Sequence, residues 1–75
     1  MMQNEHPRDL AFRCTDMVRK GESFPTVWDT RLRDHPLVSG VPRQTVNCMR
    51  PVLEIRLSTG ELLIFDGDAR RFILR

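Results

Sequence analysis

Cysteine, tryptophan and long apolar runs are scarce in this sequence, and tyrosine is absent. Two cysteines in 75 residues are too few for the disulfide framework that holds many small secreted domains together. No apolar run approaches the roughly 20 residues needed to cross a bilayer, and residues 1–6 lack the apolar core of a signal peptide. We therefore expect a cytoplasmic protein without a membrane partner.

Enzymatic and metal-binding signatures are also missing. The glycines are spread singly and form neither a phosphate-binding loop nor a nucleophile elbow. Cys14, His35 and Cys48 stand at spacings that match no zinc pattern. Cys14 falls on the apolar stripe of an expected helix, where a thiol is inert, so its use as a nucleophile with His35 as base is disfavoured. The sequence predicts no catalysis, no metal and no cofactor.

The composition is that of a globular domain, with 40% hydrophobic and 29% charged residues. At 75 residues one domain buries only about 60% of the surface of the unfolded chain, which leaves its stability marginal. Residues 1–6 have no hydrophobic period and little apolar content. We expect residues 1–6 to be a disordered tail and residues 7–75 to form a single domain.

The first helix is predicted over residues 7–20. Its apolar stripe has the helical spacing i, i+3, i+4, i+7 and consists of Leu10, Ala11, Cys14, Met17 and Val18. Pro7 suits the first turn, and Gly21 ends the helix. Phe12 falls on the opposite side, near Arg8 and Arg19, so it should face outward.

A second helix is predicted from an N-cap at Ser23 to about Asp34. Its apolar stripe consists of Phe24, Val27, Trp28 and Leu32. His35-Pro36 ends it, and the short connection at residues 21–23 predicts that the two helices form a helical hairpin.

The C-terminal third of the sequence alternates between apolar and polar residues. Residues 52–57 and 61–65 flank Thr59-Gly60, and a second turn signal at residues 66–69 leads into residues 71–75. This pattern predicts a three-stranded antiparallel meander. Whether residues 44–49 add a short extra strand stays open, because Pro51 argues for an edge position or a bulge. The predicted fold is α+β, with the helical hairpin packed on the meander.

Two registers compete for the main hairpin. A strict two-residue turn would need Thr59 at positive φ, which a β-branched residue resists. A type I turn with a glycine bulge requires positive φ only at Gly60, and this register is therefore favoured. In the favoured register Ile55 lies opposite Leu63. Leu62 and Ile64 then emerge as an apolar patch on the face away from the core.

Protein interaction is the function class with most support. Eleven of the twelve basic residues are arginine, which is common at interfaces. Outward Phe12 beside Arg8 and Arg19, and the Leu62 and Ile64 patch, are surfaces of the kind that bind partners. The last predicted strand, residues 71–75, has an unpaired edge unless residues 44–49 pair with it. Arg70, Arg71 and Arg75 lie on or beside this strand, and the alternative is that their like charge keeps the edge unpaired.

We therefore predict a small non-enzymatic interaction module whose protein partner is unknown. Self-association into a homodimer would use the strand edge or the Phe12 face. The opposing interpretation is that the connector at residues 37–49 covers these surfaces.

The alternative function is a small nucleic-acid-binding accessory or regulatory protein. The outline of helix, glycine-containing turn and helix resembles a helix-turn-helix, but the second helix carries Asp29 and only one outward basic residue, Arg33. A basic sheet face would be the other route, and it would be formed by Arg56, Arg70, Arg71 and Arg75. Phe65 and Phe72 are the only aromatic residues there, so stacking on bases has little support.

Overall fold

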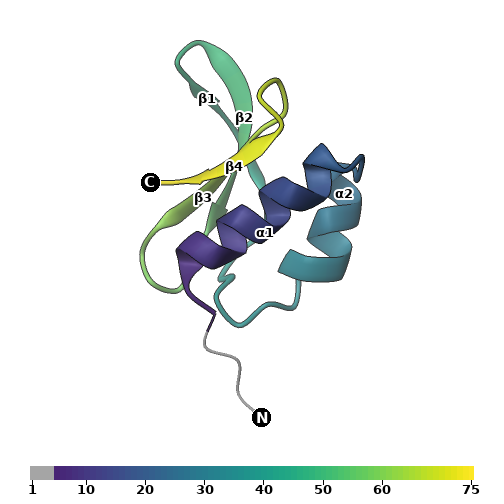
Figure 1. The fold of residues 1–75 in the computed structure, drawn as a ribbon. Coiled ribbons are helices and arrows are strands. Elements are labelled where there is room, and N and C mark those ends of the chain that lie inside the picture. The colour runs from purple at the N-terminus through teal and green to yellow at the C-terminus, as the bar shows by residue number, and fades with distance from the viewer. Residues whose placement is uncertain (1–4) are drawn as a thin grey trace.

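The computed structural model describes residues 5–75. Two helices cover one face of a four-stranded antiparallel sheet, whose strands lie side by side in sequence order (Figure 1). The predicted α+β class is confirmed. Two details of that prediction need correction, because the sheet has four strands instead of three and the helices do not form a clear hairpin.

Helix α1 (Pro7–Arg19) begins and ends as its sequence indicates. The His6 side chain accepts a hydrogen bond from the Arg8 N–H at the N-terminus, and Gly21 takes a φ of 110° after the C-terminus. Its buried side chains include Leu10 and Cys14, so the predicted apolar stripe faces the sheet. Glu5 and His6 belong to the segment that we predicted to be a tail, and both contact the domain; residues 1–4 lie outside the described residues.

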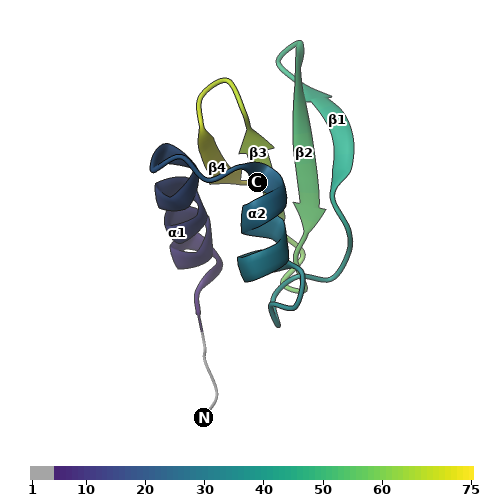
Figure 2. The ribbon, with the colours of Figure 1, turned by 90° about the vertical axis from the view of Figure 1, so that its right-hand side faces the viewer.

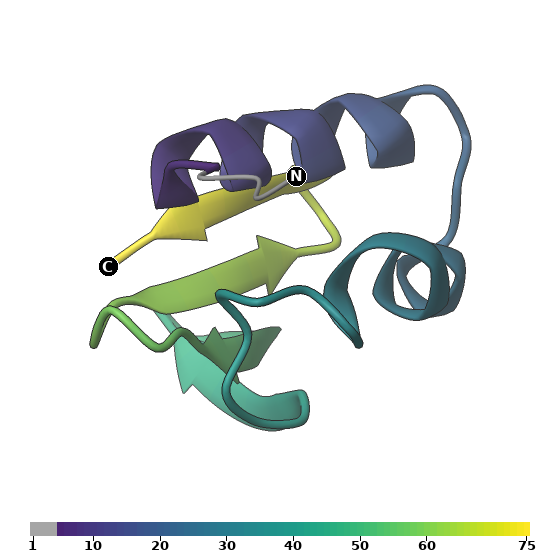
Figure 3. The same cartoon turned by 90° about the horizontal axis from the view of Figure 1, so that it is seen from below.

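The second helix is shorter and less regular than predicted. Ser23 caps α2 (Phe24–Val27), which continues as a π-helical turn, η1 (Trp28–Leu32). The Arg33 N–H donates to the Trp28 carbonyl at 2.7 Å, which is the wider i to i−5 bond of such a turn. In Figure 3, α1 lies along the sheet while α2 is seen nearly end-on, so the two helices cross.

The extra strand is present as β1 (Arg43–Asn47), which pairs with β2 (Arg50–Arg56) at one edge of the sheet. A two-residue turn joins them, with Cys48 and Met49 both at positive φ. Pro51 lies opposite Val46 inside this hairpin. Its missing N–H would point away from β1 and beyond the end of the β2–β3 pairing, so a proline is tolerated there.

The register of the main hairpin is confirmed. β2 pairs with β3 (Leu62–Asp66) so that Ile55 lies opposite Leu63, and Gly60 has a φ of 95°. β4 (Arg71–Leu74) then pairs with β3 and forms the other edge of the sheet.

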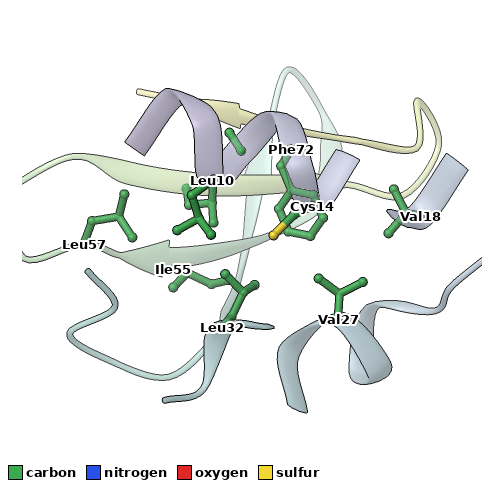
Figure 4. Close-up of a cluster of buried hydrophobic side chains, with 10 residues drawn as sticks. Leu10, Cys14, Val18, Val27, Leu32, Ile55, Leu57 and Phe72 are labelled. Carbon is green, nitrogen blue, oxygen red and sulfur yellow. The ribbon is translucent and has the colours of Figure 1, made fainter. Parts of the chain in front are cut away.

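The core lies between the helices and the sheet (Figure 4). Its largest fully buried side chains come from the helical segments, from β2 and β3, and from the residue that follows β2: Leu10, Leu32, Ile55, Leu57, Leu63, Val27 and Cys14. Met17 and Trp28 are only partly buried and pack against this cluster.

The helix-free face of the sheet is curled. Arg75, after β4, donates a 3.0 Å hydrogen bond to Asn47 on β1, although the first and fourth strands of a flat sheet would lie about 14 Å apart. Arg50 also pairs with buried Asp66 on this face. The curl explains a correction: Ile64, predicted to be exposed, is only 4% exposed, while Leu62 is half-buried.

Candidate interaction surface

A groove of about 520 Å³ runs between α1 and β4. Ala11 and Phe72 contribute buried lining, and Leu74 is half-buried. The exposed lining includes Phe12 and three arginines, Arg8, Arg19 and Arg71. We refer to this surface as the α1–β4 groove. Figures 2 and 3 show α1 lying beside β4 along this edge.

Phe12 is the exposed aromatic residue of the groove. It lies between Ala11 and Arg13 on α1, off the buried stripe, and its side chain is 79% exposed. Phe24 of α2 instead packs against Phe65 and Phe72 of the sheet, and the three ring centroids lie 4.8 to 6.1 Å apart. Three of the four phenylalanines are thus used for folding, and Phe12 is available for binding.

The arginines of the groove are not neutralised. Among residues 5–75, Arg8, Arg19 and Arg71 form no ion pair, whereas Arg13 pairs with Glu5 and Arg33 pairs with Asp29. The other ion pairs also fall outside the three groove arginines.

Glu61 is the carboxylate that lines the groove, and it accepts a hydrogen bond from the Thr59 hydroxyl at 2.9 Å. Three unpaired guanidinium groups against one carboxylate give the groove a positive charge. An acidic ligand would therefore be favoured there.

We expected the β4 edge to present a row of unbonded backbone N–H and C=O groups, but the outward groups of Phe72 are bonded. The Thr15 hydroxyl on α1 accepts a hydrogen bond from the Phe72 N–H at 2.8 Å and lies 3.3 Å from the Phe72 carbonyl, to which it donates. The Arg19 Nε donates to the Arg70 carbonyl at 3.2 Å. α1 therefore occupies the space that an added strand would need.

The structure brings together four of the residues predicted to interact: Phe12, Arg8, Arg19 and Arg71. Arg70 touches this group only through its carbonyl, at a turn where its φ is 54°. The remaining three, Leu62, Ile64 and Arg75, lie on the helix-free face.

One exposed region was not predicted. Val46 on β1 is 69% exposed and Met49 in the adjoining turn is 94% exposed. Figure 2 shows this β1–β2 tip projecting beyond the helices. The sequence carried little signal for it, because residues 43–47 contain a single apolar residue, Val46, and Pro51 argues against a regular strand.

The groups considered for catalysis are occupied by structural contacts. Cys14 is fully buried, and burial followed by the charge of Glu5 raises the pKa of its thiol to about 12. The His35 Nε2 lies 2.9 Å from Glu5 Oε1, and its Nδ1 accepts the Leu37 N–H at 3.0 Å. Both ring nitrogens of His35 are therefore already bonded.

Neither metal-ligand geometry, nor helix length, nor similarity to known proteins assigns a further function. Within residues 5–75, no three His, Cys, Asp or Glu side chains are placed to hold a metal ion, and no helix is long and apolar enough to span a membrane. No family model, curated protein or solved structure matches the chain. The geometry and charge of the groove are therefore the features from which a function can be inferred.

Proposed function

We propose that this protein is a non-enzymatic protein-interaction module whose docking surface is the α1–β4 groove. Its partner is a protein segment with an apolar side chain next to acidic residues. The observation that carries the proposal is Phe12, 79% exposed beside a groove that three unpaired arginines line. The two free cysteines fit a reducing compartment, in agreement with a cytoplasmic location.

Phe12 supplies the binding energy in this proposal. Removing a phenylalanine side chain fully from water stabilises a complex by roughly 1.5 to 3 kcal/mol. Aromatic residues and arginines are also the residue types that dominate measured interface energies. Because Arg8 and Arg71 need not give up an existing ion pair, they can attract an acidic partner without a competing loss.

A second copy of the chain is a poor occupant of this groove. A symmetric contact between two grooves would bring Arg8, Arg19 and Arg71 of one copy toward the same arginines of the other. Such like-charge contacts oppose association. We therefore assign the groove to a different protein.

Selection of peptides tests this proposal. A displayed library of random 12-residue peptides is selected on the wild-type protein, and the selected peptides are then titrated against Phe12→Ser and Met49→Ser. Both substitutions remove a strongly exposed apolar side chain, but only Phe12 lines the groove. We expect binding to weaken at least tenfold with Phe12→Ser and to be unchanged with Met49→Ser.

The charge of the groove is tested in the same titrations. Arg8→Glu and Arg56→Glu change the net charge equally, and neither arginine forms an ion pair within residues 5–75, but Arg56 lies outside the groove. We expect acidic peptides to lose affinity only with Arg8→Glu, and the effect to shrink as salt rises. Selected peptides that bind Phe12→Ser and Arg8→Glu as tightly as the wild type would show that the groove is not the docking surface.

The second candidate function is binding of nucleic acid through the helix-free face. Strand alternation places five arginines on this face: Arg43, Arg50, Arg56, Arg71 and Arg75. Three carboxylates pair with two of them, Glu54 with Arg43 and both Asp66 and Asp68 with Arg50, while Arg71 at the β4 edge also lines the groove. Such a face can contact phosphates. It offers no stacking platform, since Phe65 and Phe72 lie on the opposite face in contact with Phe24.

Polarisation of labelled single-stranded and duplex oligonucleotides tests this candidate. Phosphate binding requires an affinity that falls steeply with salt and that drops with Arg56→Glu. No binding at ~50 mM salt, where such contacts are strong, removes nucleic acid as a partner.

A further inference from the structure

The two edges of the sheet differ. Along β4, α1 packs against the strand and the Thr15 hydroxyl bonds both outward groups of Phe72. Along β1, no such cover exists in the described part of the chain: neither Gln44 nor Val46 takes part in a hydrogen bond from outside the sheet. The free edge of this sheet is therefore β1.

The direction of the β1 backbone groups follows from the adjoining turn. In a two-residue hairpin the flanking residues, here Asn47 and Arg50, exchange hydrogen bonds, and the bonded pairs then recur at every second residue. Thr45 and Arg43 consequently direct their N–H and C=O groups toward β2. Gln44 and Val46 direct theirs away from the sheet, into solvent.

The side chains along this edge leave room for another strand. Val46 is 69% exposed on the helix side of the sheet. A shallow hollow of about 280 Å³ lies along the same hairpin, lined in part by Gln44, Leu53 and Phe65. Figures 1 and 2 show that this end of the β1–β2 hairpin extends beyond both helices, so neither helix covers it.

We propose that two copies of the chain pair through β1, antiparallel, with Thr45 opposite Thr45 of the partner subunit. The pairing continues the four-stranded sheet of each copy into one sheet across the two-fold axis. Gln44 then exchanges two backbone hydrogen bonds with Val46 of the partner subunit. By symmetry, Val46 exchanges two with Gln44 of the partner subunit, so about four backbone hydrogen bonds form in total.

This register is self-complementary. Arg43 falls opposite Asn47 of the partner subunit, so no two charged residues are paired directly across the new ladder. The Arg75 guanidinium, bonded to the Asn47 side chain at 3.0 Å, is the nearby like charge. β1 has few of the features that normally prevent edge strands from pairing, since it contains no bulge and no lysine. Its one charged residue is Arg43, whose guanidinium lies 3.8 Å from the Glu54 carboxylate of the same chain. Because β1 and β4 are opposite edges, the pairing leaves the α1–β4 groove open and is independent of any ligand there.

A disulfide trap tests the register directly. Thr45 and Thr45 of the partner subunit would form a non-hydrogen-bonded pair with Cα atoms about 4.5 Å apart, within the range that a disulfide can bridge. Thr45→Cys is made in a Cys48→Ser background, which removes the exposed native thiol and leaves buried Cys14. We expect rapid formation of a covalent dimer on mild oxidation. The matched control is Arg43→Cys, whose two copies would be separated by four residue steps, or about 13 Å.

Charge variants test the pairing without a covalent bond. Gln44→Glu with Val46→Glu places carboxylates opposite each other twice, and Gln44→Lys with Val46→Lys does the same with ammonium groups. We expect each double variant to be monomeric by light scattering at ~0.5 mM and an equimolar mixture to form a heterodimer, because opposite charges then face each other. Circular dichroism confirms that each variant is folded.

The mass of the wild-type protein completes the test. We expect a dimer at ~0.5 mM that Phe12→Ser leaves unchanged, which separates this surface from the groove. A monomeric wild type at that concentration, or a Thr45→Cys disulfide that forms no faster than the Arg43→Cys one, overturns the proposal.

Discussion

The Thr15 hydroxyl lies 2.8 Å from the Phe72 nitrogen and 3.3 Å from its carbonyl oxygen, so one helical side chain satisfies both outward groups of an edge-strand residue. This contact fixes α1 along β4. It also closes that edge to an added strand and places Phe12 beside the α1–β4 groove. With the β4 edge covered in this way, β1 at the opposite side of the sheet is the edge that stays free.

Thr15→Val should destabilise the fold. Valine matches threonine in shape and in helix propensity, but it leaves the Phe72 N–H and carbonyl without their partner, at a cost of about 1 to 2 kcal/mol. Urea unfolding measures the loss. Thr30→Val is the control, because the Thr30 hydroxyl bonds only the Thr26 carbonyl on an exposed helix, and it should change stability by less than ~0.5 kcal/mol. Equal effects of the two substitutions would mean that the Thr15 contact contributes nothing.

Leu32→Ala should be one of the most damaging single substitutions. Leu32 is fully buried at the end of the π-helical turn, so truncation should cost about 2 to 5 kcal/mol, much of the stability of a small domain. Thermal unfolding of Leu32→Ala and of Val41→Ala measures the difference, since Val41 is exposed and should tolerate the change. Similar melting temperatures for the two variants would contradict the placement of η1 in the core.

Alkaline pH should weaken the fold through Cys14. The folded thiol keeps its proton because burial raises its pKa from 9.0 to about 12, while the unfolded thiol ionises above about pH 9. The stability contributed by this site is therefore fully present below pH 9 and falls between pH 9 and 12, by up to about 1.4 kcal/mol per pH unit. Denaturation of Cys14→Ala over the same range is the comparison, and its stability should fall less steeply. Parallel curves for the two proteins would refute the link to Cys14.

The sequence was sufficient wherever a local rule decided the structure. Gly60 marks the one position in its turn that tolerates positive φ, and this was enough to choose the register that places Ile55 opposite Leu63. The apolar spacing on α1 likewise identified the buried stripe, and with it the exposure of Phe12.

Other features had no local signal. The β1–β2 turn uses Cys48 and Met49 at positive φ, where asparagine and glycine are the usual residues, so the sequence did not mark a hairpin. The π-helical form of residues 28–32 also has no signature in its composition. The Thr15 to Phe72 contact joins residues 57 positions apart, and such a contact depends on tertiary packing. For that reason the closed edge of β4 and the free edge of β1 could not be assigned from the sequence.

Amide hydrogen exchange tests the difference between the two edges most directly. Phe72 and Val46 are both edge-strand residues, but the Phe72 N–H is bonded to Thr15 while the Val46 N–H is directed into solvent. In dilute protein we predict strong protection of the Phe72 amide and almost none for Val46. At ~0.5 mM the Val46 amide should become protected as the β1 strands pair. A Phe72 amide that exchanges as fast as that of Val46, or a Val46 amide equally protected at every concentration, would contradict this account.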